Sequence, residues 1–262
     1  MKKLFAVGVG GILSLSTTHG ALYNGNGITG AGGAVGEGSL NLTDNGTTIS
    51  ATFNKGGSPS TQFADVLVLF VDSVANGFAD TSQFSDTSSG LTKAVSGLLR
   101  PDARSTAVFV GGLTADYAIA VSVNNGAAVY HLVSGSTLEF VRNIPFSPTD
   151  TTINSAYSFS FDWNDIGLGS AATKSFDFES SYITATGSRS LESFESILGG
   201  STAGFGGTVT FSSFDTYPLP AVPEPANAAL AVFGSMALGA VIFNRVRKHI
   251  ALSRLTEAQA TN

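Results

Sequence analysis

Alternation of aromatic and small polar residues is the feature that most limits what this chain can fold into. In "AYSFSFDW", residues 156–163, one tyrosine and two phenylalanines alternate with serines. Successive side chains of a strand point to opposite faces, so this segment predicts a half-buried β-strand. The stretch "GSLNLTDNGTTISATF", residues 38–53, carries Asp44-Asn45-Gly46 between two alternating runs, and this pattern is typical of a β-hairpin.

The neighbouring segments repeat this pattern of strands and turns. The run "DVLVLFVD", Asp65 to Asp72, is apolar between two carboxylates, which predicts a strand buried on both faces. Further strands are predicted in "DYAIAVSVNNGAAVYHLVSGSTLEFV", "SFDFESSYITATG" and "GTVTFSSF". Only "SSGLTKAVSGLL" and "SLESFESILGG" have the pattern of short helices. Residues 21–215, the passenger, are therefore expected to be all-β, a two-sheet antiparallel β-sandwich.

Charge and the lack of cysteine exclude several classes of function. Residues 22–217 carry seven Lys and Arg against seventeen Asp and Glu, a net charge of −10. Nucleic-acid binding needs positive charge to neutralise phosphates, so no nucleic-acid partner is expected. The chain has no cysteine, which excludes disulfides, cysteine-ligated metals and thiol catalysis. The passenger must be held together by its core, to which the nineteen phenylalanines of the chain contribute.

The N-terminus has the composition of an export signal. Lys2 and Lys3 precede an apolar stretch from Leu4 to Leu15. This stretch is too short to cross roughly 30 Å of hydrocarbon, but it suits the core of a signal peptide. We therefore predict a signal helix over residues 1–20, recognised by the Sec translocon and removed by signal peptidase near Ala21. A buried core segment or a retained anchor is the alternative.

The C-terminal segment has the composition of a linker followed by a membrane span. Four of the eight prolines lie between Pro218 and Pro225, which predicts a stiff linker over residues 216–225. Residues 226–243 carry no charge, and as a helix they would extend about 27 Å, close to the hydrocarbon thickness of a bilayer. A single transmembrane helix is therefore predicted over residues 226–243.

A basic cluster follows the apolar run at once. Arg245, Arg247 and Lys248 are expected to act as a stop-transfer signal, because basic residues are retained on the cytoplasmic side of a membrane. Residues 244–262 are therefore predicted to be a basic cytoplasmic tail. The acidic passenger is predicted to lie on the opposite side of the membrane.

The box Val222-Pro223-Glu224-Pro225, the apolar span and the basic cluster together resemble the PEP-CTERM sorting signal of Gram-negative bacteria. The resemblance covers about the last forty residues. It implies that exosortase, an integral-membrane protease-transpeptidase, recognises the box and releases or transfers the passenger. It also implies a transient inner-membrane anchor with the passenger in the periplasm, then a place at the cell surface or in an exopolysaccharide-containing biofilm matrix. An ordinary single-span anchor is the alternative.

Two stretches of the passenger carry a second, looser likeness. They are the apolar run ending in an acidic residue, "VLVLFVDSVANG", and the later tryptophan-containing strand, "YSFSFDWNDIGLG". These are similar to DOMON-like sandwiches and family-nine carbohydrate-binding modules, a resemblance that implies a site for sugar or haem. Haem is not expected, because both methionines, Met1 and Met236, lie in the terminal segments. Trp163, the only tryptophan, fits a core position better than a sugar-stacking one.

Loop carboxylates are the candidate ligand or calcium sites of the passenger. The candidates, with the tryptophan between two of them, are Asp72, Asp80, Asp86, Asp162, Trp163 and Asp165. Such oxygen ligands suit Ca²⁺, and paired carboxylates suit glycosidase chemistry. Asp162 can instead serve a turn, because aspartate readily binds nearby backbone N–H groups. No ordered calcium-loop motif is present, so no metal is assigned and no cofactor is expected.

Two other patterns are interpreted as structural. Gly25, Gly27 and Gly30 match the spacing of a dinucleotide fingerprint, which needs a strand before it and a helix after it. Here the predicted signal cleavage site precedes the glycines and Ala-Gly-Gly follows them, so a flexible leader is expected. His131 is the only histidine of the passenger, too few for a multi-histidine zinc site. We assign no catalytic residue. The chain is expected to be a non-enzymatic structural or adhesive protein in contact with exopolysaccharide; the alternative is an envelope carbohydrate-active enzyme that uses the loop carboxylates.

Overall fold

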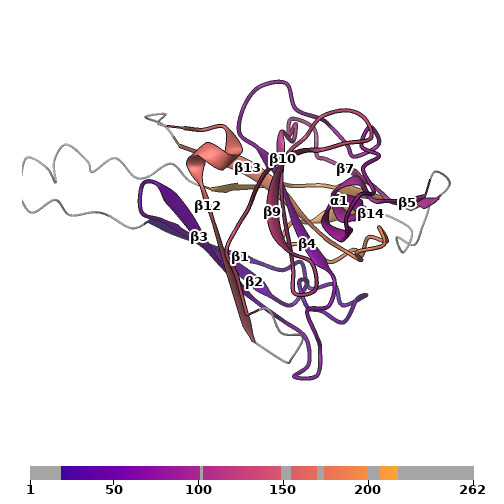
Figure 1. The fold of residues 1–262 in the computed structure, drawn as a ribbon. Coiled ribbons are helices and arrows are strands. Elements are labelled where there is room, and N and C mark those ends of the chain that lie inside the picture. Colours follow the sequence, from indigo (N-terminus) through magenta and orange to yellow (C-terminus); the bar gives the residue numbers. More distant parts are fainter. Residues whose placement is uncertain (1–18, 101–102, 149–154, 170–173, 200–206, 218–262) are drawn as a thin grey trace, which may run out of the picture. The chain divides into compact units, whose positions relative to one another are not determined.

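The computed structural model describes residues 19–100, 103–148, 155–169, 174–199 and 207–217 (Figure 1). Two antiparallel sheets make up most of this part of the chain. The first sheet has the strand order β1-β2-β3-β12-β11. Its strands are β1 (His19–Asn24), β2 (Ser39–Asp44), β3 (Thr48–Asn54), β11 (Phe146–Ser147) and β12 (Ala156–Asp162).

The second sheet has the strand order β10-β9-β8-β4-β13-β16. Its strands are β4 (Val66–Asp72), β8 (Tyr117–Ser122), β9 (Gly126–His131), β10 (Glu139–Asn143), β13 (Phe176–Ile183) and β16 (Asp215–Tyr217). All of its neighbouring strands pair antiparallel. The long central pairing joins β4 to β13, in register from Val66 opposite Ile183 to Asp72 opposite Asp177.

Shorter elements complete the described fold. They are α1 (Gly90–Ser96), β5 (Leu98–Arg100), β6 (Ala103–Arg104), β7 (Thr106–Val108), the 3₁₀ turn η1 (Trp163–Ile166), β14 (Ile197–Gly199) and β15 (Thr208–Phe211). The strands β14, β15 and β7 form a small third sheet. The helix begins after Ser89, whose Oγ accepts the Thr92 N–H at 3.1 Å, and it ends at Gly97 in the left-handed conformation, with φ of 63°.

One hydrophobic core lies between the two large sheets. The first sheet contributes Tyr157, Phe159 and Phe161 of β12, and the second contributes Leu67 and Leu69 of β4. Their neighbours along β12 are more exposed, because alternate side chains of this strand face away from the core. The prediction of a mostly β passenger with two antiparallel sheets is confirmed, and the packing is consistent with a β-sandwich.

A second hydrophobic core covers the opposite face of the second sheet. Val66, Val68 and Phe70 of β4 pack there with residues of α1 and of β15. Every residue from Val66 to Val71 is therefore buried, which confirms the prediction that this strand is buried on both faces. Full burial of one such side chain stabilises the fold by ~1.5–3 kcal/mol.

Local patterns predict several elements correctly. The expected hairpin is β2 and β3, and its turn holds Gly46 at φ of 90°, a conformation that glycine adopts without steric cost. The first predicted helix is α1. The second predicted helix, in "SLESFESILGG", is wrong, because this segment runs without a helix into β14. Its residues Glu192 and Glu195 are buried and accept hydrogen bonds from other segments, so they do not form the exposed face of a helix.

The glycine-rich segment after β1 is an anchored loop, and the prediction of a flexible leader is wrong. The Gly25 N–H donates to Gly38 O at 2.8 Å, and the Gly27 N–H donates to Gly36 O at 2.6 Å. Glycine at position 36 permits a close approach of two backbones, since a Cβ there would lie 1.8 Å from the Ile28 carbonyl oxygen. The glycines therefore serve packing between two passes of the chain.

Both predicted boundaries of the passenger meet a strand. β1 begins at His19 and pairs with β2, so cleavage near Ala21 would leave four of its six residues paired. β16 extends through Tyr217, which is buried and donates to Asp44 Oδ2 at 2.9 Å. The first two residues assigned to the linker, 216 and 217, therefore belong to a strand.

The terminal segments carry several of the predictions. Residues 1–18, the Pro-Glu-Pro box, the predicted span over residues 226–243 and the predicted tail over residues 244–262 lie outside the described residues. Within the described residues, no helix has the length and apolar character needed to cross a bilayer.

Candidate functional site

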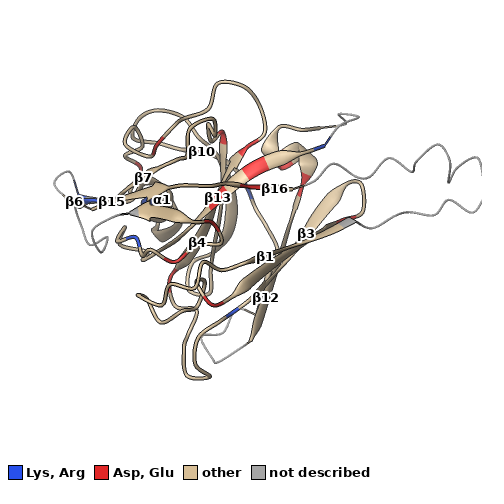
Figure 2. Cartoon of the chain, turned by 180° about the vertical axis from the view of Figure 1, so that it is seen from behind, with Lys and Arg blue, Asp and Glu red and all other residues tan. Residues whose placement is uncertain are grey.

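Acidic residues are distributed over many strands and loops of the described part rather than gathered on one element (Figure 2). Three of the predicted ligands, Asp72, Asp80 and Asp86, each bind backbone N–H groups. The bonds run from Thr114 N to Asp72 Oδ2 at 2.7 Å, from Ser82 N to Asp80 Oδ1 at 2.7 Å, from Ser88 N to Asp86 Oδ1 at 2.8 Å and from Leu138 N to Asp86 Oδ2 at 2.9 Å. These aspartates therefore shape turns and join loops, a role that sequence reasoning considered for Asp162 alone.

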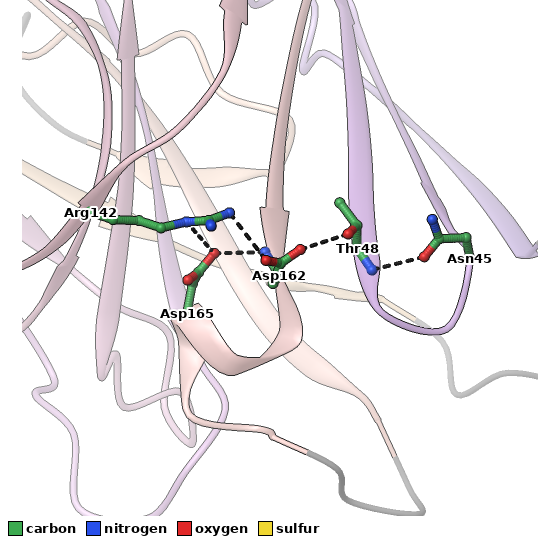
Figure 3. A network of polar contacts seen from close by, with 5 residues as sticks. All are labelled: Asn45, Thr48, Arg142, Asp162 and Asp165. Carbon is green, nitrogen blue, oxygen red and sulfur yellow. Dashed lines mark hydrogen bonds and ion pairs between the residues drawn. The ribbon is translucent and has the colours of Figure 1, made fainter.

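Asp162 and Asp165 share a cation supplied by the chain (Figure 3). Arg142 on β10 reaches Asp165 Oδ2 with Nε at 2.9 Å and Asp162 Oδ2 with Nη2 at 3.4 Å. The Asp162 N–H also donates to Asp165 Oδ2 at 2.7 Å, across the start of η1. Because β10 belongs to the second sheet and β12 to the first, this group ties the two sheets together at one end.

The turn between β2 and β3 extends this network. Thr48 donates its hydroxyl to Asp162 Oδ1 at 2.6 Å, and its N–H donates to Asn45 Oδ1 at 2.9 Å (Figure 3). Each carboxylate in the group thus has donors from the chain itself. Among the described residues, no three His, Asp or Glu side chains come together in a way that could hold a metal ion.

Trp163 belongs to the core, as expected for a lone tryptophan in an alternating strand. Only 1% of it is exposed, and its ring lies 5.9 Å from that of Phe176 and 5.8 Å from that of Tyr217. The Lys174 ammonium lies 5.4 Å from the centre of the ring. A hollow of about 310 Å³ borders Trp163 and Lys174, next to residues 170–173, which lie outside the described part.

Glu192 is a polar anchor that the sequence did not indicate. Its carboxylate is fully buried and accepts four backbone N–H groups of the glycine-rich loop. The donors are Ala31 at 2.6 Å and Gly33 at 2.9 Å to Oε1, and Val35 at 3.1 Å and Gly36 at 3.4 Å to Oε2. The run of glycines was the available signal, because successive backbone N–H groups can form an anion-binding concavity.

Two further buried carboxyl groups, Glu179 and Glu195, lie near each other. Glu179 Oε1 accepts the Val110 N–H at 2.9 Å, and Glu195 Oε2 accepts the N–H and hydroxyl of Ser180 at 2.8 and 2.7 Å. Burial raises the pKa of each to about 8, and the Glu195 charge adds to the shift of Glu179. Within the described residues, Glu179 Oε2 and Glu195 Oε1 have no hydrogen-bond partner.

Arg189 is a buried cation that supports the second core. It donates to the Ser105 carbonyl at 3.0 Å, to Ser181 Oγ at 2.8 Å and to the Val95 carbonyl near the end of α1 at 3.0 Å. Burial lowers its pKa to about 9, and the nearby charge of Arg104 adds to this effect. A cation at this end of a helix is stabilised by the exposed carbonyls of the last turn.

A pocket of about 260 Å³ lies beside Arg189 and the glycine-rich loop. Its walls come from that loop, from Asp65 just before β4, from Tyr182 on β13 and from the segment after β13. Sequence reasoning assigned none of these residues to a site, because they are brought together only by the fold. Comparison of the chain with protein-family models, with curated proteins and with solved structures finds no match.

Proposed function

We propose that this chain is an exported surface or extracellular-matrix protein, sorted through its C-terminal segment. The observation that carries the proposal is the order of three features: Val222-Pro223-Glu224-Pro225, the uncharged residues 226–243 and the basic cluster that follows. The N-terminal signal would deliver the chain to the Sec translocon and signal peptidase. The C-terminal helix would hold it in the inner membrane until an exosortase-type enzyme cleaves it.

The chemistry of the box suits recognition by a protease. Pro223 and Pro225 fix φ and remove two backbone donors, so the segment stays extended and free of internal hydrogen bonds. A protease cleft can therefore take up its backbone without first unfolding it. Glu224 presents a negative charge near the membrane surface, where a basic pocket of the enzyme could bind it.

The passenger is proposed to act as a structural or adhesive, non-enzymatic module that contacts exopolysaccharide. Glycosidases place two carboxyl groups on either side of the scissile bond, ~5–9.5 Å apart. Here Asp162 and Asp165 are bound to Arg142, and Asp72 is bound to Thr114. Carboxylates held by donors of their own chain favour a role in stability over one in catalysis.

Replacing Pro223, Glu224 and Pro225 together by alanine is expected to stop processing. The amount of released protein should fall at least about tenfold, equivalent to the loss of ~1.4 kcal/mol of recognition energy, while the uncleaved chain accumulates in the inner membrane. Cell fractionation and mass spectrometry of the C-terminus measure both amounts. The matched control replaces Pro218 and Pro220, which lie in the same linker, and should be processed normally. Unchanged release of the triple variant would contradict the proposal.

A further inference from the structure

The pocket beside the glycine-rich loop has walls that the fold holds in place. Tyr182 and Arg189 line it, and each is only 2% exposed. The loop on its other side is fixed by the bonds from Ala31 and Gly33 to Glu192. Its volume of about 260 Å³ lies just below the ~300–1,000 Å³ typical of pockets for drug-sized ligands. A single small ligand, of the size of one sugar unit, fits these dimensions.

Asp65 brings an unused acceptor to this pocket. The side chain is half-buried, and no donor within the described residues reaches its carboxylate, in contrast to Asp72 or Asp162. Burial, and then the charge of Glu192, raise the pKa of Asp65. A carboxylate accepts hydrogen bonds only, and partial removal from water is costly without a donor. A ligand that donates hydroxyl hydrogens would meet this need.

Ser190 brings an unused donor to the same pocket. Its Oγ accepts the Glu192 N–H at 3.1 Å, and the described part of the chain offers no acceptor for the hydroxyl hydrogen. Ile28, Leu191 and the ring of Tyr182 add apolar wall to the pocket. A sugar ring combines hydroxyls, which both donate and accept, with apolar C–H faces. The pocket therefore has acceptor, donor and apolar wall in one place.

Other ligand classes fit this chemistry less well. Ca²⁺ takes six to eight oxygen ligands, several of them commonly carboxylates, and Asp65 is the only carboxylate among the described residues that line the pocket. An anion would face the charges of Asp65 and the nearby Glu192. Arg189 does not offset them for a ligand, because its guanidinium donates to the carbonyls of Ser105 and Val95 and to Ser181.

We propose that this pocket binds one neutral sugar residue, whose hydroxyls donate to Asp65 and accept from Ser190. The inference deepens the proposed function and rests on it, since it names the ligand chemistry of the exopolysaccharide contact. It also sets a preference. Neutral sugars bind more tightly than uronic acids, because a second carboxylate would be placed next to Asp65.

The test is a titration of the full chain, purified in a phosphocholine detergent because maltoside and glucoside detergents would compete. The probes are glucose, galactose, mannose, rhamnose, N-acetylglucosamine and maltose, with glucuronic acid as the charged comparison. Binding is measured by saturation-transfer NMR and calorimetry. At least one neutral sugar is expected to bind, more tightly than glucuronic acid. Asp65→Asn should weaken that binding about tenfold, in line with hydrogen bonds to a charged group.

A matched pair of glycine variants tests the place of binding. Gly30 lines the pocket, whereas Gly111 lies in a turn that does not border it. Both glycines are exposed, and a Cβ added at either position meets no heavy atom within 4 Å. Gly30→Phe should fill the pocket and abolish binding, whereas Gly111→Phe should bind as the wild type does. Glu139→Gln, which removes an exposed carboxylate on β10, is the control for Asp65→Asn.

Several outcomes would overturn the inference: no neutral sugar bound, glucuronic acid preferred, or binding unchanged in Asp65→Asn or Gly30→Phe. The sorting experiment distinguishes this failure from failure of the proposed function. Normal processing without sugar binding removes the pocket inference alone. Binding at Asp65 without any processing at the Pro-Glu-Pro box instead removes the sorting role and leaves a sugar-binding pocket.

Discussion

Glu192→Ala is expected to lower the free energy of unfolding by about 4 kcal/mol, since each buried N–H left without an acceptor costs roughly 1–3 kcal/mol. The variant removes the acceptor of four N–H groups, at Ala31, Gly33, Val35 and Gly36. The last three of these residues are buried, so water cannot replace the carboxylate without opening the loop. Urea denaturation followed by the emission of Trp163, which is buried in the core, measures the change.

Two further variants separate loss of the anchor from loss of charge. Glu37→Ala removes an exposed carboxylate of the same loop and should change stability by less than ~0.5 kcal/mol, as surface substitutions usually do. Glu192→Gln keeps one acceptor oxygen but turns an NH₂ group towards two of the N–H donors, so it should lose more than half of the stability lost in Glu192→Ala. Equal melting of Glu192→Ala and wild type would show that the loop does not depend on the carboxylate.

The same anchor shows where prediction from the sequence stops. The strand β12 and the hairpin of β2 and β3 are encoded within a few residues, by alternation and by an Asn-Gly turn, and both were predicted. Glu192 meets its donors across 156 to 161 positions of the chain, a distance at which no spacing rule operates. The segment that holds Glu192 was predicted to be helical, because the sequence alone does not distinguish buried glutamates from those on the exposed face of a helix.

In the candidate site, too, residues marked by local sequence were predicted, whereas partners brought together by the fold were not. The aspartates were found as candidates because they lie in one strand-end and loop region or flank Trp163. Binding of backbone N–H groups was considered only for Asp162. The partner of Asp162 and Asp165 was not found, since Arg142 reaches them from the other sheet. Asp65 was noted only as the flank of a strand. Its place in a pocket depends on Tyr182 and Leu191, which the fold brings from more than a hundred residues away.

Raising the pH from about 5 to 8.5 is expected to destabilise the passenger, contrary to the usual effect of buried carboxylates that are ion-paired. Burial raises the pKa of Glu179 and of Glu195 from 4.5 to about 8. Between these values the folded state holds protons that the unfolded chain has released, so stability falls with rising pH. The stabilisation that these two protonated groups give the folded state is fully present below about pH 4.5 and is lost as the pH rises through about 8. Burial raises the pKa of neighbouring Asp215 to about 6, which acts in the same direction.

The size of this effect follows from the shifts. One pKa unit corresponds to about 1.4 kcal/mol, and relaxation around the ionised pair limits the total loss to roughly 2–4 kcal/mol. A domain of about two hundred residues shifts its melting temperature by ~2–4 °C per kcal/mol. The midpoint at pH 8.5 should therefore lie roughly 5–15 °C below that at pH 5. Thermal melting followed by circular dichroism at a series of pH values measures this difference.

The double variant Glu179→Gln, Glu195→Gln tests the cause. Glutamine keeps the shape of a protonated carboxyl group but cannot ionise, and its oxygen can still accept from Val110 or Ser180, as the glutamates do. The variant should therefore match the wild type near pH 5 and melt at a higher temperature at pH 8.5. Glu139→Gln, at an exposed carboxylate of β10, should leave the pH difference unchanged. If the double variant kept the full pH difference, groups other than this buried pair would have to cause it.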